Sequence, residues 1–314
     1  MNDDRLRALI ARFPAARIAV LGDFFLDKYL DVDPALAETS VETGKVAHQV
    51  AGVRCEPGAA GTVANNLAAL GAGTLHAIGF TGDDGEGHDL RAALARIRCA
   101  TDHLHRVPER RTPTYLKPRN AGDPTLAGEH ARYDTKNRLP LPPAASERIV
   151  ASLDRLLPQV DALVVMDQVE EEDCGAVTEA VREAVASRAP RHPRVVFWAD
   201  SRRRIRRYRN VIVKPNAFEA VGNEHPRPGD AVADDALRRA VEALRKETGA
   251  PVCVTRGAAG MAVSDPDWTP VPGVRVEGPT DPTGAGDSAT AGAVLALVAG
   301  ATLPEAALVG NLVA

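Results

Sequence analysis

The chain has 314 residues, of which 45% are hydrophobic and 25% are charged, proportions typical of a globular protein that buries one large core. Its net charge of -4 and the lack of an apolar run of about 18 residues give no reason to expect nucleic acid or a membrane as a partner. The N-terminus has no secretory pattern and the four cysteines lack disulfide or zinc spacing, so we expect a cytoplasmic protein with reduced thiols.

Apolar residues at helical spacing predict a short first helix that ends near Pro14. Continuous apolar strands bounded by glycine or proline then recur, at 17–21, 75–79, 162–166, 195–199, 211–213 and 252–255. Strands that alternate with helices predict an α/β fold with a mostly parallel sheet and helices on both faces. Ligands of such sheets bind at the carboxyl ends of the strands, so we expect functional residues just after them.

The first strand is followed by a polar loop, 22–29, that carries Asp27. Two later segments have a mixed pattern without helical period, which predicts β-structure outside the main sheet. Ordinary surface hairpins are the alternative. The predicted domains are a core of 1–30, 57–111 and 136–314 and a β-rich unit of 31–56 and 112–135.

A glycine-containing turn leads into an Ala/Leu helix that is expected to end at Gly71. Further along, the acidic run 170–173 follows a predicted strand, and we interpret it as the capped start of a helix. The arginines between 202 and 209 are interpreted as a solvated face, with one of them a candidate contact to a nucleotide.

Asn216 and Glu219 follow the strand at 211–213 and lie one helical turn apart, facing the same side. Carboxylate oxygen suits Mg²⁺, which proteins hold largely through water and substrate phosphates. A simple helix start with Pro215 in its first turn is the alternative. The strand at 252–255 leads into a glycine-containing hairpin.

The stretch 281–293 is Asp-Pro-Thr-Gly-Ala-Gly-Asp-Ser-Ala-Thr-Ala-Gly-Ala, followed by more small apolar residues. Glycines on both sides of Ala285 let the backbone turn sharply, and the first N–H groups of the following helix lack internal partners. The turn therefore predicts a phosphate site. Asp287 could take a proton from a hydroxyl while these N–H groups hold a phosphoryl group. The alternative is an ordinary capped helix.

The 281–287 string before a small-residue helix resembles the signature of the ribokinase-like (PfkB) carbohydrate kinases, and four other stretches are similar to that family in the same order. The resemblance implies a three-layer α/β/α sandwich with a mostly parallel sheet and a small β-strand lid. It also implies transfer of the ATP γ-phosphate to a sugar hydroxyl with Mg²⁺. Gly284, Ala285 and Gly286 would form the anion hole, and Asp287 would be the base.

The resemblance assigns roles to other residues as well. Asp27 would bind sugar hydroxyls, together with the turn at Gly58, Ala59 and Thr62. Two of these depart from the family pattern, since Ala59 replaces a glycine and Thr62 replaces an asparagine. A hydroxyl has a shorter reach and fewer hydrogen-bonding groups than a carboxamide, so the identity of the sugar stays open.

On the nucleotide side, Asn216 and Glu219 would organise Mg²⁺ through water, together with the ATP phosphates. The resemblance places the other nucleotide contacts at Thr255, Arg256, Gly257 and Gly260. Asp281 and Thr283 would hold a monovalent cation such as K⁺, as in some relatives.

The loop with Asp27 and the second β-rich segment look most like those of the bacterial D-glycero-D-manno-heptose 7-phosphate kinases, a group within this family. Lys117, Arg119 and Arg132 are the candidate cations for an acceptor phosphate. Alternatives are another hexose, sugar phosphate or nucleoside as the acceptor, or a binding protein without turnover. A homodimer through the lid is a further expectation.

Overall fold

The computed structural model describes residues 1–123, 128–274 and 283–314. Its centre is a six-stranded sheet with the order β10-β9-β8-β1-β4-β5, in which every neighbouring pair is parallel. The strands are β1 Arg17–Gly22, β4 Thr74–Thr81, β5 Cys99–Arg106, β8 Ala162–Asp167, β9 Val196–Ser201 and β10 Ile212–Val213. The strand order reverses at β1, so the crevice between the ends of β1 and β8 is where such a sheet binds ligands.

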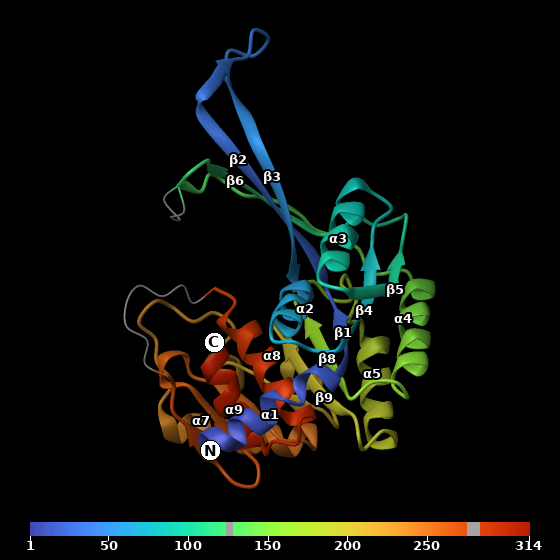
Figure 1. The fold of residues 1–314 in the computed structure, drawn as a ribbon, viewed down its shortest axis with the longest axis vertical. Coiled ribbons are helices and arrows are strands. Elements are labelled where there is room, and N and C mark those ends of the chain that lie inside the picture. Colours follow the sequence, from blue (N-terminus) through green and yellow to red (C-terminus); the bar gives the residue numbers. More distant parts are fainter. Residues whose placement is uncertain (124–127, 275–282) are drawn as a thin grey trace.

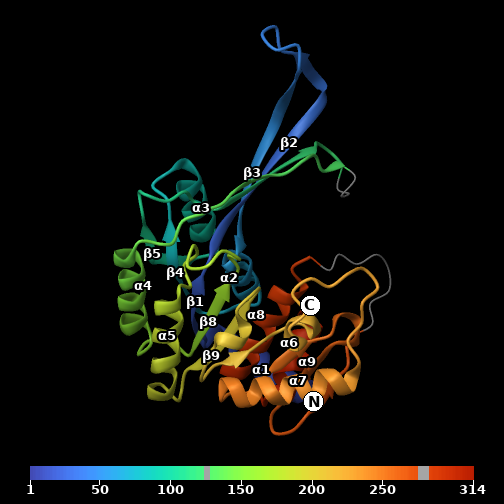
Figure 2. The ribbon, with the colours of Figure 1, turned by 180° about the vertical axis from the view of Figure 1, so that it is seen from behind.

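Helices cover both faces of this sheet (Figures 1 and 2). Along β1, Ile18 and Val20 belong to one buried cluster and Ala19 and Leu21 to another, as alternation along a strand requires. The first cluster includes α1 Asp3–Ile10, α2 Ala60–Ala69, α3 Gly85–Arg96, α8 Ala285–Val298 and α9 Leu303–Val313. The second includes α4 Pro143–Leu156, α5 Glu179–Arg188 and α7 Asp234–Thr248. The predicted three-layer α/β/α sandwich is confirmed.

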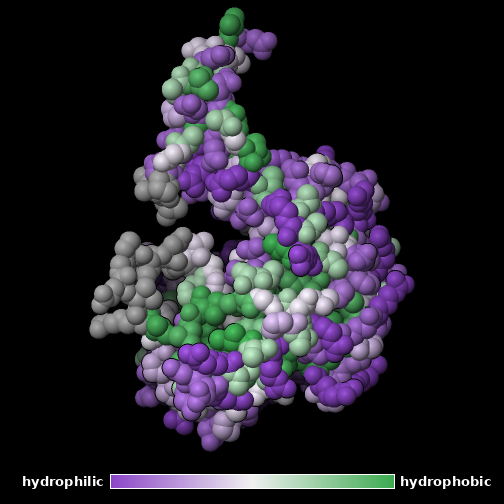
Figure 3. Space-filling model, viewed as in Figure 1, coloured by the Kyte–Doolittle hydropathy of each residue, from purple (hydrophilic) through white to green (hydrophobic). Residues whose placement is uncertain are grey.

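A second sheet has the strand order β3-β2-β6-β7. Its strands are β2 Phe24–Thr39, β3 Val46–Ala59, β6 Thr114–Asn120 and β7 Tyr133–Thr135. Only Asp23 separates β2 from β1, and β2 and β3 continue as a long hairpin that projects from the sandwich (Figure 1). We call residues 31–52 of this hairpin the arm. Apolar side chains are exposed along it (Figure 3), namely Leu36, Val41, Val46 and Val50.

A third, antiparallel sheet corrects one prediction. The apolar stretch at 252–255 does not extend the parallel sheet, because its main partner is the next strand along the chain. This sheet consists of β11 Cys253–Thr255, β12 Met261–Val263 and β13 Thr269–Val271. Single parallel bridges from Val252 to Val213 and from Thr255 to Asn216 attach it to the main sheet. Strand β5 was not predicted, because polar residues interrupt its apolar run. Such an alternation of polar and apolar residues is typical of an edge strand.

The acidic run 170–173 does not begin a helix. Residues 168–178 form turns, and α5 begins at Glu179 with Thr178 as its N-cap. The glutamates instead pair with arginines that follow β9: Glu170 with Arg203 at 3.0 Å, Glu172 with Arg207. The arginines are therefore largely ion-paired rather than a solvated face, because β8 and β9 are neighbours and their end loops meet.

The remaining elements are short. Helix α6 spans Ala217–Val221, and 3₁₀ turns lie at Phe13–Ala15, Ala189–Arg191, Ile205–Arg207 and Gly257–Ala259. Within the described residues, no helix has the length and apolar character needed to cross a membrane.

Candidate active site

The head of α8 forms a sharp turn with outward N–H groups. Gly284 caps the helix with φ 79°, a left-handed conformation that favours glycine. The helix then runs through small apolar residues that are buried on all sides, so it is fixed in the core. Its first N–H groups, at Ala285, Gly286 and Asp287, have no intrahelical acceptor and carry the positive end of the helix dipole. Such an arrangement suits an anion.

Asp287 is half-buried in the first turn of α8. Burial, and next the negative charge of Asp200, raise the pKa of Asp287 to about 6, while Lys214 and Arg202 oppose the rise. The carboxyl is thus still ionised at neutral pH, but it is a stronger base than an exposed aspartate. Such a pKa is typical of a general base.

Lys214 is a buried cation close to the turn. It follows β10 directly, is 4% exposed, and its Nζ lies 2.7 Å from the Asp200 carboxylate. A Cβ built on Gly286 would lie 3.5 Å from the same Nζ, so the ammonium sits behind the anion-binding turn. Burial opposes the charge on Lys214, but the carboxylate of Asp200 more than offsets it, and the pKa of Lys214 is raised.

Asn216 and Glu219 form a capping box at the start of α6. The Asn216 Oδ1 accepts from the Glu219 N–H at 2.9 Å, and the Glu219 Oε2 accepts from the Asn216 N–H at 2.7 Å. Burial, the larger cause, and the charge of Asp200 raise the pKa of Glu219 to about 7. Three carboxylates, Asp200, Glu219 and Asp287, therefore share one buried lysine, and this excess of negative charge suits a bound cation.

The hairpin between β11 and β12 lies beside the capping box. Thr255 donates its N–H to the Pro215 carbonyl at 3.0 Å. Gly257 and Gly260 have φ of 56° and 84°, and a Cβ on Gly260 would lie 2.3 Å from the backbone N of Gly273. Only glycine fits there. The predicted nucleotide contact Arg256 pairs with Asp234 of α7, so its side chain is engaged outside the hairpin.

Asp27 lies on β2 in the second sheet, beside β3 and β6. Lys117 on β6 approaches the Asp27 Oδ2 at 3.1 Å, with both side chains mostly buried. The Asp27 Oδ1 is buried and has no hydrogen-bond partner among the residues that the structure describes. A Cβ on Gly58 would lie 2.9 Å from that oxygen, so the absence of a side chain at Gly58 keeps room for it. A buried acceptor without a donor is costly and points to a ligand.

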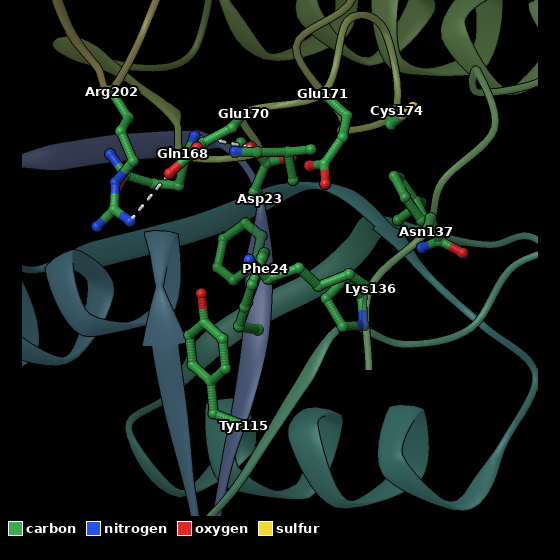
Figure 4. Close-up of a pocket in the computed structure, with 15 residues that line it drawn as sticks. Asp23, Phe24, Tyr115, Lys136, Asn137, Gln168, Glu170, Glu171, Cys174 and Arg202 are labelled. Atoms are coloured by element: carbon green, nitrogen blue, oxygen red, sulfur yellow. Dashed lines mark hydrogen bonds and ion pairs between the residues drawn. The ribbon is translucent and has the colours of Figure 1, made fainter. Parts of the chain in front are cut away.

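The strand-end pocket lies in the crevice outside β1, β8 and β9, next to Asp27. Phe25 and Asp27 are two residues apart on β2 and therefore lie on the same face of the strand. Tyr115 on β6 is the register partner of Asp27. Figure 4 shows Tyr115, Lys136 and Arg202 extending into the pocket from different sides. The pocket is lined by Gly22, Asp23, Phe24, Phe25, Phe80, Pro113, Tyr115, Lys136, Asn137, Gln168, Val169, Glu170, Glu171, Cys174 and Arg202. Its water-accessible space is about 20 Å³, room for one water.

The other predicted acceptor residues differ in their surroundings. Thr62 lies in the first turns of α2 and is half-buried. Ala59, the N-cap of α2, has φ 54° and ψ −116°, a conformation that suits the glycine it replaces. Arg132 pairs with Asp134 at 2.7 Å and lies 4.4 Å from the centre of the Tyr115 ring.

Three further expectations concern peripheral positions. Arg119 lies 3.9 Å from the Asp31 carboxylate and donates a hydrogen bond to the Asp123 carbonyl, so its positive charge is partly compensated. Thr283 lies in the turn before α8, while Asp281 lies outside the described residues. The proposed monovalent cation site therefore has one described member.

Three residues of the site were not predicted, namely Lys214, Tyr115 and Lys136, and Arg202 was predicted only as one of several arginines of which one could contact a nucleotide. A signal existed for Lys214 and Arg202, because each directly follows a strand of the parallel sheet. No comparable signal exists for Tyr115 and Lys136, because strand pairing in the second sheet brings them to the pocket.

Comparison with known proteins agrees with this geometry. The sequence matches the pfkB family of carbohydrate kinases over residues 16–314. The chain belongs to this family. PfkB kinases are phosphotransferases that act on alcohol groups, so the outward N–H groups at the head of α8 and the neighbouring Asp287 have the chemistry that this reaction needs.

Among curated PfkB relatives, the chain is 32% identical over 320 residues to the bifunctional protein HldE of Caulobacter vibrioides, and 28% identical over 308 residues to HldE of Gluconobacter oxydans. These alignments cover 99% and 96% of this chain. They cover 61% of each relative, so the chain spans about three-fifths of the length of these proteins.

Solved structures share the fold. Phosphofructokinase-2 from Escherichia coli in complex with fructose-6-phosphate has a TM-score of 0.69 and 19% identity, with 94% of this chain and 91% of that chain covered. Ribokinase from Cryptococcus neoformans in complex with ADP has a TM-score of 0.60 and 18% identity, with 93% and 90% covered.

Proposed function

We propose that the chain transfers the γ-phosphate of ATP to a hydroxyl of a sugar phosphate, with Asp287 as the general base. The observation that carries the proposal is the head of α8, where a half-buried carboxylate and outward N–H groups share one turn. A pKa of about 6 leaves Asp287 ionised at neutral pH yet basic enough to accept a proton from a hydroxyl.

The reaction follows from this geometry. Asp287 takes the proton of the acceptor hydroxyl, and the oxygen bonds to the γ-phosphorus while the bond from that phosphorus to the β–γ bridging oxygen breaks. ADP leaves with that electron pair. The N–H groups of Ala285, Gly286 and Asp287, together with Lys214 close to Gly286, stabilise the negative charge on the phosphoryl oxygens.

Mg²⁺ fits the residues on the nucleotide side. Asp200, Glu219 and Asp287 carry more negative charge than Lys214 compensates, and the pKa of about 7 at Glu219 reflects this excess together with burial. No group of three or more acidic, His or Cys side chains forms a complete metal site in the described part of the chain. Asn216 and Glu219 would therefore hold Mg²⁺ through water, and the ion would neutralise phosphate charge when bound.

The acceptor is proposed to bind between the strand-end pocket and the second sheet. The unpaired Asp27 Oδ1 would accept a hydrogen bond from a sugar hydroxyl, while Lys117 holds the other oxygen. Residues 31–56 and 112–135 would act as a lid over the core of 1–30, 57–111 and 136–314, excluding water that competes for the γ-phosphate.

Heptose 7-phosphate is the preferred candidate acceptor. The stretches around Asp27 and Lys117 resemble those of the heptose 7-phosphate kinases, and Lys136 and Arg202 offer positive charge in the strand-end pocket. The exposed apolar side chains of the arm support a homodimer through the lid. Thr283, with Asp281, would hold K⁺.

The test is ADP release by the purified chain with MgATP and a panel of heptose 7-phosphate, fructose 6-phosphate, ribose and a nucleoside. We expect acceptor-dependent ADP release that is lost in Asp287→Asn. Turnover of another panel member alone would change the acceptor and keep the mechanism. Thermal stabilisation by ATP or sugar without any ADP release would instead indicate a binding protein and refute the proposal.

A further inference from the structure

Arg202 lies at the boundary between two hollows of the molecule. It is the first residue after β9, and its N–H donates to the Asp167 carbonyl at 3.0 Å. One hollow is the strand-end pocket. The other, which we call the Asn216 cavity, contains Asn216, Phe218 and Glu219 among its lining residues. Among the described residues, only Arg202 and Glu170 line both.

The neighbouring arginines are committed to other partners. Arg204 is 5% exposed and lies 3.1 Å from the buried Asp167, so its charge is used inside the fold. The remaining pairs are Arg203 with Glu170 at 3.0 Å, Arg206 with Glu247 at 2.9 Å, and Arg207 with Glu172. The pairs with Glu170 and Glu172 hold the loops after β8 and β9 together, and the pair with Glu247 joins the second loop to α7.

Arg202 is held more loosely. Within the described part of the chain, its acidic partner is the Glu170 Oε1 at 3.7 Å, which is too long for a hydrogen bond, and 55% of its side chain is exposed. Glu170 already has a closer partner in Arg203. Arg202 can therefore leave Glu170 at little cost, because exposed ion pairs of this kind are weak.

The charge of Arg202 reaches the reacting groups. It lowers the pKa of Asp287 and of Glu219, after the larger effects of burial and of Asp200, and it also acts on Tyr115 in the strand-end pocket. Its position agrees with these effects, since Arg202 lines the Asn216 cavity together with Glu219 and the strand-end pocket together with Tyr115. Figure 4 shows it projecting along the edge of the pocket toward Tyr115.

We propose that Arg202 exchanges Glu170 for the γ-phosphate of ATP and is a catalytic residue that follows the phosphoryl group during transfer. The inference rests on the proposed function and adds to it. A guanidinium can donate two parallel hydrogen bonds to phosphoryl oxygens. As the acceptor oxygen bonds to phosphorus and the β–γ bridging bond breaks, Arg202 stabilises the charge on those oxygens.

The first test needs no acceptor. The affinities of the chain for MgADP and for the Mg²⁺ complex of the ATP analogue with an imido β–γ bridge are measured by calorimetry. Wild-type protein is expected to bind the triphosphate analogue more tightly than MgADP. In Arg202→Gln the ratio of the two affinities is expected to fall about tenfold, while the affinity for MgADP changes little. A wild-type preference retained in Arg202→Gln would overturn the proposal.

Arg203→Gln is the matched control. Arg203 pairs with the same Glu170 and lines the Asn216 cavity, but it does not line the strand-end pocket. We expect it to keep the preference for the triphosphate. An equal loss in both variants would show that disruption of the Glu170 loop, rather than a phosphate contact, is responsible, and it would also overturn the proposal.

Steady-state kinetics give the second test. With the panel acceptor that wild-type protein uses, kcat of Arg202→Gln is expected to fall by about 100-fold or more, with the acceptor KM changed by less than about threefold. A raised KM at wild-type kcat would make Arg202 an acceptor-binding residue and refute the assignment. If Asp287→Asn is inactive while Arg202→Gln has normal kcat, the proposed function stands and this inference fails.

Discussion

Replacement of Asp287 by Asn is expected to abolish phosphoryl transfer and to stabilise the fold at neutral pH. Burial and the charge of Asp200 raise the pKa of this carboxyl from 3.8 to about 6. At about 1.4 kcal/mol per pH unit, ionisation in the folded state costs about 3 kcal/mol more than in the unfolded chain. Residual exposure and the favourable helix dipole, worth about 0.5 kcal/mol, reduce the expected net gain to about 1–2 kcal/mol.

The pH dependence fixes the sign of this effect. Below about pH 4 the Asp287 carboxyl is protonated in both states, so the wild-type protein and the Asn variant should be equally stable. Between about pH 4 and pH 6 the unfolded chain releases the proton while the folded protein retains it, and the wild-type protein loses stability relative to the variant. Above about pH 6 the difference should be constant.

Urea unfolding followed by circular dichroism at several pH values between about 4 and 8 measures the difference in the free energy of unfolding. Asp235→Asn is the control, because Asp235 is an exposed aspartate in the first turn of α7. It is expected to lose a few tenths of a kcal/mol through the helix dipole alone. An Asp287→Asn variant no more stable than the wild-type protein at pH 8, or equally more stable at pH 4, would refute the reasoning.

Three further predictions follow from the same structure. The log of kcat/KM should fall with unit slope below about pH 6, as Asp287 becomes protonated; a flat acid limb down to pH 5 would exclude it as the base. Ala59→Gly should raise stability by about 1 kcal/mol in thermal unfolding, because relief of the positive φ exceeds the added entropy of the unfolded chain; a lower Tm would contradict this. Arg204→Met should cost about 3–5 kcal/mol in urea unfolding by leaving the buried Asp167 unpaired, whereas Arg207→Met at the surface should cost less than about 1 kcal/mol; equal losses would contradict the burial argument.

The parallel sheet and the head of α8 could be predicted because each is encoded locally. Apolar runs identified β1, β8 and β9, and the two glycines and Asp287 lie within a single turn of sequence. The same holds for Asn216 and Glu219, whose capping box is a local arrangement. Local signals of this kind do not depend on which strands become neighbours.

Other features of the site depend on strand pairing and could not be predicted. Glu170 was expected to cap a helix, but neighbouring strands bring it to the arginines after β9. Tyr115 meets Asp27 only because β6 pairs with β2 in one register. The stretch at 252–255 has the composition of a buried parallel strand, yet the following turn returns the chain to pair with it.

The junction between β1 and β2 determines how the arm can move. Asp23, the only residue between these strands, accepts hydrogen bonds from the backbone N–H groups of Gln168, Val169 and Ala176 at 2.7–2.9 Å, so the start of β2 is fixed to the loop after β8. The first irregularity in the β2–β3 ladder occurs farther out, at Asp31/Val32, where the arm begins. Bulges of this kind bend strands, so the hairpin should stay stiff up to residue 30 and bend at the base of the arm.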